Sequence, residues 1–359
     1  MARRTVTLEF QPALDDAKGR KELRDGLSTV LQVGRTLWVA SDESACVERL
    51  TLAGARAGDH VQFRLGDFLD LPAPGEDGET SEVDVEGMAC ADGYLWVVGS
   101  HSVKRAKAVP EDSVARAIKR LGCTEKEANR FLLARIPMQE QDDLPTLVRK
   151  ARPRRAQRLS GGTQGNALTR LLRKDKHLAP FIGLPGKENG FDIEGLAVVG
   201  ERLFLGLRGP VLCGWAMVLE LRPGGAGDAL ELRRFEGRKA RRVRKHFLQL
   251  GGLGVRDLCL QGEDLLVLAG PTMGLDGPVR VLRWPGATRC EGPCVLEADK
   301  LPVVLVLPFG TGCDHAEGMT PFAPDGGAPA LLVVYDSPAP KRQVGASGLL
   351  ADVFALPRP

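Results

Sequence analysis

Residues 190–210 read "GFDIEGLAVVGERLFLGLRGP", which is the pattern of two short apolar strands joined by a tight turn. An acid followed by a glycine, Glu194 and Gly195, stands near the start of the first strand. Such a pattern occurring five times in one register indicates an internal repeat. The other four copies are "GLSTVLQVGRTLWVASDES" at 26–44, "DVEGMACADGYLWVVGSHS" at 84–102, "GVRDLCLQGEDLLVLAGPT" at 254–272 and "HAEGMTPFAPDGGAPALLVVYDSP" at 315–338.

Each copy is followed by further apolar runs that complete a four-stranded unit. The first copy has a third run at 47–54 and a fourth at 60–65, and in the second copy we expect the fourth strand at 178–184. The last copy has no fourth run, but the N-terminal "RTVTLEF" at 4–10 supplies one. Four antiparallel strands in about 60 residues are typical of a propeller blade. The sequence therefore predicts an all-β fold, a five-bladed β-propeller closed by its N-terminal strand.

The second repeat is longer than the others. We expect residues 1–359 to form a single domain, with insertions at 106–128 and 139–180 inside the second blade. Helical spacing of apolar residues occurs at 111–130 and 167–178, so the insertions are expected to be partly helical. A degenerate copy of the repeat hidden in this stretch would instead give six blades.

One position of the repeat carries unusual chemistry. We call the residue at this position, Glu194 in the copy quoted first, the lead residue of each copy. Repeat symmetry maps equivalent positions onto a ring, so the five lead residues should meet at the top of a central channel. Glycine after the lead would allow neighbouring strands to approach closely. Converging acids repel, and two solutions remain open: Ca²⁺ held by Glu86, Glu194 and Glu317, or a salt bridge to Arg256. The lead residues are Ser28, Glu86, Glu194, Arg256 and Glu317.

The loops that open on the same face add polar residues to a predicted rim. Cationic and acidic side chains around an acidic centre suit a small anionic ligand, such as a phosphate or carboxylate, bridged by a metal ion. The rim residues are Asp42, Glu43, His101, Lys104, Lys187, Arg208, Asp314, His315 and Asp336.

Composition narrows the class of protein. The net charge is only +3, and the basic runs at 149–158 and 233–245 lack interleaved aromatics, which argues against a nucleic-acid partner. No apolar stretch has the length of a membrane span, and the N-terminus has no signal-peptide core. The eight cysteines have no CxxC spacing, and the closest pair is Cys290 and Cys294. We therefore expect a cytoplasmic protein with reduced thiols.

The phrases "EGLA" and "EGMA", the loop "GSHS" at 99–102 and "LRGPVLCGWA" at 207–216 resemble a bacterial β-propeller family known only as a domain of unknown function. The resemblance implies a fold and no activity. A looser similarity is to five-bladed calcium-activated nucleotidases (apyrases), which place one Ser or Glu per blade around a central Ca²⁺. Ser28, Glu86, Glu194 and Glu317 match that layout, and Arg256 departs from it.

Two hypotheses for function follow. The first is a propeller that binds a ligand or a protein partner at the top of its channel, with no chemistry of its own. The alternative is a metal-assisted hydrolase of a phosphoester or other anionic small molecule. No GxSxG elbow or assembled Ser-His-Asp motif is present, so the sequence leaves enzymatic activity open and assigns no catalytic residue.

Overall fold

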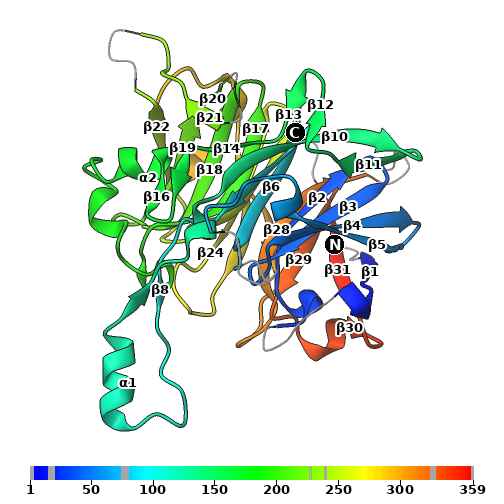
Figure 1. Ribbon diagram of the computed structural model, residues 1–359, viewed down its shortest axis with the longest axis horizontal. Coiled ribbons are helices and arrows are strands. Elements are labelled where there is room, and N and C mark those ends of the chain that lie inside the picture. Colours follow the sequence, from blue (N-terminus) through cyan, green and yellow to red (C-terminus); the bar gives the residue numbers. More distant parts are fainter. Residues whose placement is uncertain are drawn as a thin grey trace.

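The computed structural model describes residues 4–14, 21–73, 81–225, 227, 229–237, 241–323 and 329–356. Over these ranges the chain is mostly β, with strands arranged in sheets that stand around a common centre and few helices (Figure 1). Across these ranges, no helix combines the length and the apolar character that crossing a membrane requires.

The principal strands form antiparallel sheet units whose members follow one another along the chain, except where β1 completes the last unit. Positive-φ glycines, such as Gly34, Gly200 and Gly262, provide the turns between the first two strands of units 1, 3 and 4. Unit 1 contains β2 (Leu27–Val33), β3 (Thr36–Ser41), β4 (Cys46–Ala53) and β5 (Arg56–Arg64); unit 2 contains β6 (Val85–Ala91), β7 (Tyr94–Gly99), β10 (Leu133–Gln141) and β14 (Gln157–Leu159); unit 3 contains β17 (Asp192–Val199), β18 (Arg202–Gly209), β19 (Trp215–Leu221) and β22 (Val243–Gln249); unit 4 contains β23 (Gly254–Gln261), β24 (Asp264–Gly270), β25 (Val279–Trp284) and β27 (Val303–Leu307); unit 5 contains β28 (His315–Phe322), β29 (Ala330–Asp336), β31 (Gly348–Ala355) and β1 (Arg4–Glu9).

The first strands of the units contact one another in a closed order. β2 contacts β6, β6 contacts β17, β17 contacts β23, β23 contacts β28, and β28 returns to β2. Apolar side chains fill the space between successive units; Trp38 and Leu95, for example, belong to the layer between units 1 and 2. Equivalent layers lie between units 2 and 3, 3 and 4, 4 and 5, and 5 and 1. The core is therefore a set of layers between sheets, as expected of a propeller-like fold.

The N-terminal strand closes this arrangement. β1 pairs with β31 in antiparallel register, with Val6 opposite Ala351 and Leu8 opposite Leu349. Its other edge pairs in parallel with β5 of unit 1. The predicted pairing of the two ends of the chain is confirmed, and β1 occupies edges of two units that would otherwise be open.

One predicted strand is wrong. Residues 178–184 contain a 3₁₀ turn, Ala179–Phe181, and the strand that pairs with β10 in unit 2 is β14, Gln157–Leu159. The apolar run is interrupted by Pro180, which is placed at the start of the turn, where a missing N–H costs nothing. The predicted insertion range 139–180 therefore includes a strand of the sheet itself.

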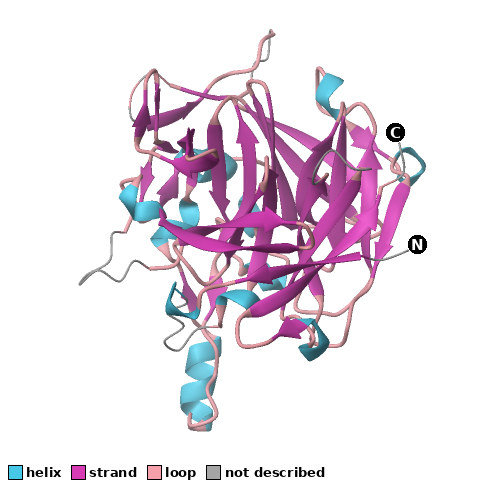
Figure 2. Cartoon of the chain, turned by 90° about the vertical axis from the view of Figure 1, so that its right-hand side faces the viewer, coloured by secondary structure: helices cyan, strands magenta, loops and turns pink. Residues whose placement is uncertain are grey.

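Other elements lie between or outside the principal strands. Helix α1 (Val114–Leu121) lies in the connection from β7 to β10 and projects from the body, with β8 and β9 at the base of the projection (Figures 1 and 2). Helix α2 (Ala167–Leu172) follows β14 and packs against β21. The remaining strands are β8 (Lys104–Arg105), β9 (Thr124–Glu125), β11 (Leu144–Leu147), β12 (Lys150–Ala151), β13 (Arg154–Arg155), β15 (Gly161–Gly162), β16 (Gly165–Asn166), β20 (Pro223–Gly224), β21 (Ala229–Leu232), β26 (Val295–Leu296) and β30 (Gln343–Val344).

The glycine that follows the acidic lead residue lies against the neighbouring unit. A Cβ on Gly195 would approach Leu258 Cγ at 2.9 Å and the Asp257 backbone at 3.0 Å, both in β23. A Cβ on Gly87 would meet Leu196 Cβ of β17 at 2.7 Å. The close approach expected from the sequence is therefore a contact between the first strands of successive units.

Replacing Gly195 by Ala is expected to destabilise the protein by about 1–3 kcal/mol, because the added methyl group overpacks a backbone contact. Chemical denaturation of the purified variant measures this loss. Gly183→Ala is the control: nothing lies within 4 Å of a Cβ built there and its φ is not positive, so its stability should change little. Equal stability of the two variants would contradict the assigned packing.

Candidate functional site

The five lead residues share a local geometry. Each lies on the first strand of its unit and has no partner residue on the second strand, although the residues on either side of it are paired. Each is therefore the extra residue of a β-bulge. An extra residue is left out of the regular pairing, and its side chain is re-aimed relative to the strand. The bulges lie at Ser28, Glu86, Glu194, Arg256 and Glu317.

Units 3, 4 and 5 are joined by ion pairs between these residues. Arg256 Nε lies 3.0 Å from Glu194 Oε2, and the Arg256 guanidinium also binds Glu317. Arg208 Nη1 donates to Glu194 Oε1 at 2.9 Å from the end of β18. All four side chains are at most 13% exposed. Burial lowers the pKa of Arg256 and the nearby Arg208 lowers it further, while the carboxylates raise it.

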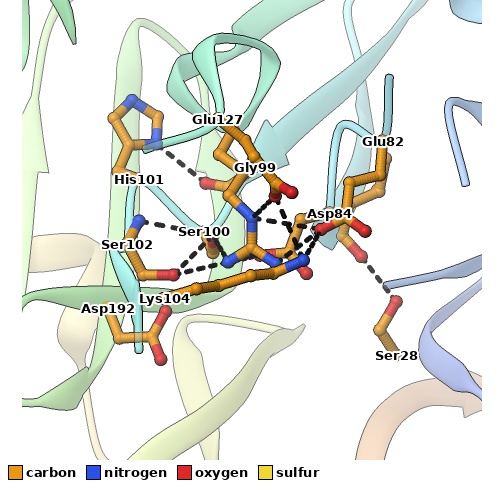
Figure 3. A network of polar contacts seen from close by, with 12 residues as sticks. Ser28, Glu82, Asp84, Gly99, Ser100, His101, Ser102, Lys104, Glu127 and Asp192 are labelled. Atoms are coloured by element: carbon orange, nitrogen blue, oxygen red, sulfur yellow. Dashed lines mark hydrogen bonds and ion pairs between the residues drawn. The ribbon is translucent and has the colours of Figure 1, made fainter. Parts of the chain in front are cut away.

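Units 1 and 2 meet through a different contact. Ser28 Oγ donates to the backbone oxygen of Val85 at 2.5 Å, next to Glu86 (Figure 3). Glu86 is half-buried, and among the described residues its carboxylate has no hydrogen bond or ion pair. Burial raises its pKa well above the ordinary value, and Asp84, Glu194, Asp192 and Asp42 add to the effect.

Three aspartates surround Glu86, and with it they form what we call the acid cluster: Asp42, Asp84, Glu86 and Asp192. Burial raises the pKa of Asp42 to about 7, with a further contribution from Asp84. Burial also raises the pKa of Asp192 to about 7, with Glu194 adding to it and Arg208 opposing it. The pKa of Asp84 is raised to about 7 by burial, although Arg130 opposes this.

Two carboxylate oxygens in the acid cluster lack partners. Asp42 Oδ1 and Asp192 Oδ1 are buried and accept no hydrogen bond from the described part of the chain. Asp192 as a whole is only 4% exposed, and its nearest ion-pair partner, Arg208, is 4.0 Å from the other oxygen. A buried acceptor without a donor is costly, so these two oxygens are poorly satisfied in the folded chain.

Arg130 forms an ion pair with Asp84, one member of the acid cluster. It comes from the 3₁₀ turn Ala128–Phe131, and its guanidinium lies 2.7 Å from each of Glu82, Asp84 and Glu127. It also donates to Ser102 Oγ at 2.8 Å (Figure 3). The three acids raise the pKa of Arg130 against the effect of its burial, so it is a permanent cation.

Several predicted rim residues have structural partners instead. His101 is buried; its Nδ1 donates to Gly99 O at 2.8 Å, and its Nε2 accepts from Asn166 at 2.7 Å. Burial lowers the pKa of His101 to about 4, so the ring is neutral. Lys104 binds Glu82 and lies 3.1 Å from Glu127.

The unit 5 side of the rim is likewise occupied by contacts within the protein. Asp336 lies 2.7 Å from Lys21 Nζ, and it is the largest cause of the raised pKa of His315. Glu43 accepts from the Lys21 backbone N–H at 2.9 Å. Buried Asp314 binds Arg342 Nε at 2.6 Å. Lys187 is exposed in the 3₁₀ turn Gly186–Glu188.

The three glutamates proposed as calcium ligands are not arranged alike. Arg256 contacts Glu194 and Glu317, so its guanidinium lies where a cation shared by these two carboxylates would bind. Within the described ranges, no group of three or more His, Cys, Asp or Glu side chains has the arrangement of a metal site. Arg256 therefore forms the salt bridge that the sequence offered as one of two solutions.

Sequence reasoning missed several residues of the site. Asp84 and Asp192 stand two residues before a lead glutamate in both "DVEG" and "DIEG", so the repeat carried a signal for them. Arg130 and Lys21 had no such signal, because neither belongs to the repeated phrase. They reach the site through loops that only the folded chain brings together.

No curated protein matches the sequence. Among solved structures, the chain is similar to a glutaminyl cyclase of Myxococcus xanthus, with 10% identity over 99% of this chain and 97% of that one, at a TM-score of 0.41. It is also similar to the PQQ-bound aldose sugar dehydrogenase of Streptomyces coelicolor, with 12% identity over 98% of both chains and a TM-score of 0.36. The Cps50 (Swd1) β-propeller domain of Myceliophteria thermophila is 10% identical over 92% of this chain and 96% of that one, with a TM-score of 0.35. Residues 26–352 match a family described as "Protein of unknown function (DUF3616)", and the chain belongs to this family.

Proposed function

We propose that this chain is a five-bladed propeller that binds a small cationic ligand carrying N–H donors at the acid cluster, at the top of its channel. The sheet units 1 to 5 would be the blades, and the closed order of their first strands supports that count over six. The observation that carries the proposal is the buried Asp192 Oδ1, which lacks a donor beside the unpaired carboxylate of Glu86.

The balance of charges supports a cation over an anion. Arg208, Arg256, Arg130 and Lys104 are each bound to carboxylates of the chain, and His101 is neutral. An anionic ligand, as the sequence suggested, would have to displace these acids. An ammonium or guanidinium group would instead donate to free carboxylate oxygens and lessen the repulsion within the acid cluster.

The proposal predicts a pH dependence. Carboxyl groups with a folded pKa of about 7 are protonated below that value, whereas in the unfolded chain they ionise near about pH 4. Stability of the unliganded protein should therefore fall as the pH rises from about 4 through about 7. Affinity for a cation should rise over the upper part of this window, because ionised carboxylates bind it.

Thermal unfolding in the presence of amines, phosphate or calcium tests the proposed binding of a cation. We expect 1,4-diaminobutane or agmatine to raise the Tm at about pH 8 and to raise it less at about pH 5, with inorganic phosphate having no effect. Stabilisation by phosphate alone would contradict the proposal. Stabilisation by CaCl₂ alone would favour the metal-assisted hydrolase, to be followed by a phosphoester assay.

A variant pair assigns the effect to the acid cluster. Asp192→Asn should weaken amine binding about tenfold or more, since it removes a charge that faces the ligand. Asp70→Asn is the matched control, because the Asp70 side chain is 91% exposed and its carboxylate lies 3.7 Å from Arg149. Equal amine binding by both variants would show that the ligand binds outside the acid cluster.

A further inference from the structure

Cys290 and Cys294 lie on the connection between β25 and β27, on either side of "EGP". Their Sγ atoms are 3.0 Å apart, about 1 Å more than the length of a disulfide bond. Both residues are half-buried free thiols. The pair is far along the chain from the acid cluster and belongs to an outer edge of the fold, not to the first strands.

Neighbouring groups hold this pair in place. The Cys294 N–H donates to His246 Nδ1 at 3.2 Å, and the Phe247 N–H donates to Cys294 O at 2.9 Å. The oxygen of Cys290 accepts from Arg202 Nη1 at 2.8 Å. His246 and Phe247 belong to β22 and Arg202 to β18, so a connection of unit 4 is fixed on unit 3.

The connection also closes a sheet edge. Immediately after Cys294, β26 pairs in parallel with β22, with Val295 opposite Phe247 and Leu296 opposite Leu248. This short strand covers the outer edge of unit 3, where unpaired backbone groups would otherwise face solvent. A covalent bond at Cys294 would thus fasten the segment that covers this edge.

We propose that Cys290 and Cys294 form a redox modification site that a low-molecular-weight disulfide converts to an intramolecular disulfide. One cysteine thiolate attacks a sulfur of the small disulfide, forms a mixed disulfide and releases one small thiol. The second cysteine thiolate then attacks the protein sulfur of that mixed disulfide and displaces the other small thiol. The protein loses two hydrogen atoms, and the small disulfide is reduced to two thiols.

The surroundings determine how the site reacts. Burial, together with the neighbouring Cys290, raises the pKa of Cys294 to about 12, so its thiolate is scarce at neutral pH. The reaction should therefore be slow near neutral pH and accelerate as the pH rises. The short separation of the two sulfurs favours the second step, because the resolving thiol is already beside the sulfur that it attacks.

Peptide mapping of the full-length protein tests the proposal. After treatment of the folded protein with oxidised glutathione, the remaining thiols are alkylated in denaturant and the chain is digested with trypsin. Cleavage after Arg289 and Lys300 places both cysteines in one peptide, residues 290–300. We expect that peptide to lack two hydrogens, to carry no alkyl group and to recover both alkyl groups after reduction.

Two variants and one further measurement complete the test. Cys290→Ser should give a stable glutathione adduct on Cys294 or an unreacted thiol, whereas Cys213→Ser, at an exposed cysteine, should leave disulfide formation unchanged. Oxidation of the natural sequence should raise the Tm by about 2 °C or more, reversibly. Alkylation of both cysteines after oxidation, a separate adduct on each, or pairing with a different cysteine would each overturn the proposal.

Discussion

Deleting residues 1–10 is expected to leave the chain without a cooperative unfolding transition. The deletion removes β1, whose Val6 and Leu8 are at most 3% exposed, together with the buried Phe10. Loss of each such side chain costs about 2–5 kcal/mol, and whole domains are stable by only about 5–15 kcal/mol. The deletion also opens the edges of β31 and β5 at the same time.

The arm that carries α1 provides the control for this deletion. No residue of α1 is buried, and the arm begins and ends at paired strands, where the Ala106 N–H donates to Cys123 O at 3.2 Å. Replacing residues 107–122 by a short glycine-containing turn removes more residues than the first deletion but should preserve the unfolding transition. Circular dichroism on heating measures both variants. A folded 1–10 deletion variant would show that closure by β1 is dispensable.

Closure by β1 was predictable because two features of the sequence indicate it. The last repeat lacks a fourth apolar run, and the N-terminus has an additional apolar run, "RTVTLEF", before the first repeat. The close packing at the glycines after Glu86, Glu194 and Glu317 was predictable for the same reason. A repeated position in a ring meets the same steric limit in each unit. Regularity of this kind is a property of the pattern, and the pattern is visible without coordinates.

Contacts that break the regularity were not predictable in the same way. The fourth strand of unit 2 is the short β14, and its sequence "QRL" at 157–159 has no apolar run to mark it. His101 follows the second strand of unit 2 and was expected on the rim, yet it is buried and bonded to Asn166 from an insertion. A loop's destination depends on long-range packing, which periodicity does not encode.

The direction of the lead side chains was predictable only in part. Repeat symmetry predicted that Glu194, Arg256 and Glu317 would meet, and their ion pairs join three units. The bulges that re-aim these side chains had no signal in the sequence, because a bulge is a shift in pairing between two strands. Which acids Arg256 would bind, and that Glu86 would stay unpaired, followed only from the folded geometry.

Replacing Arg256 by Ser is expected to destabilise the protein by about 3–5 kcal/mol. The variant leaves Glu317 without its guanidinium partner and Glu194 with Arg208 alone, in a site where both carboxylates are at most 13% exposed. A buried carboxylate without a partner is costly only while it carries its charge. The destabilisation should therefore be present at neutral pH and diminish in acid, where carboxyl groups take up protons.

Chemical denaturation at about pH 7 and about pH 4 separates a salt bridge from a metal site. Arg222→Ser is the matched control: Arg222 pairs with Glu201 at 2.6 Å, but Glu201 is 67% exposed, so the loss should stay below about 1 kcal/mol. If Arg256 serves as the cation of the ring, adding Glu317→Gln to Arg256→Ser should recover part of the stability, because it removes an unpaired charge. Recovery by CaCl₂ in the Arg256→Ser variant, lost again on adding Glu317→Gln, would mean instead that the carboxylates form a calcium site once the guanidinium is gone. A variant as stable as the natural sequence at both pH values would contradict both interpretations, since each requires Arg256 to offset the buried acids.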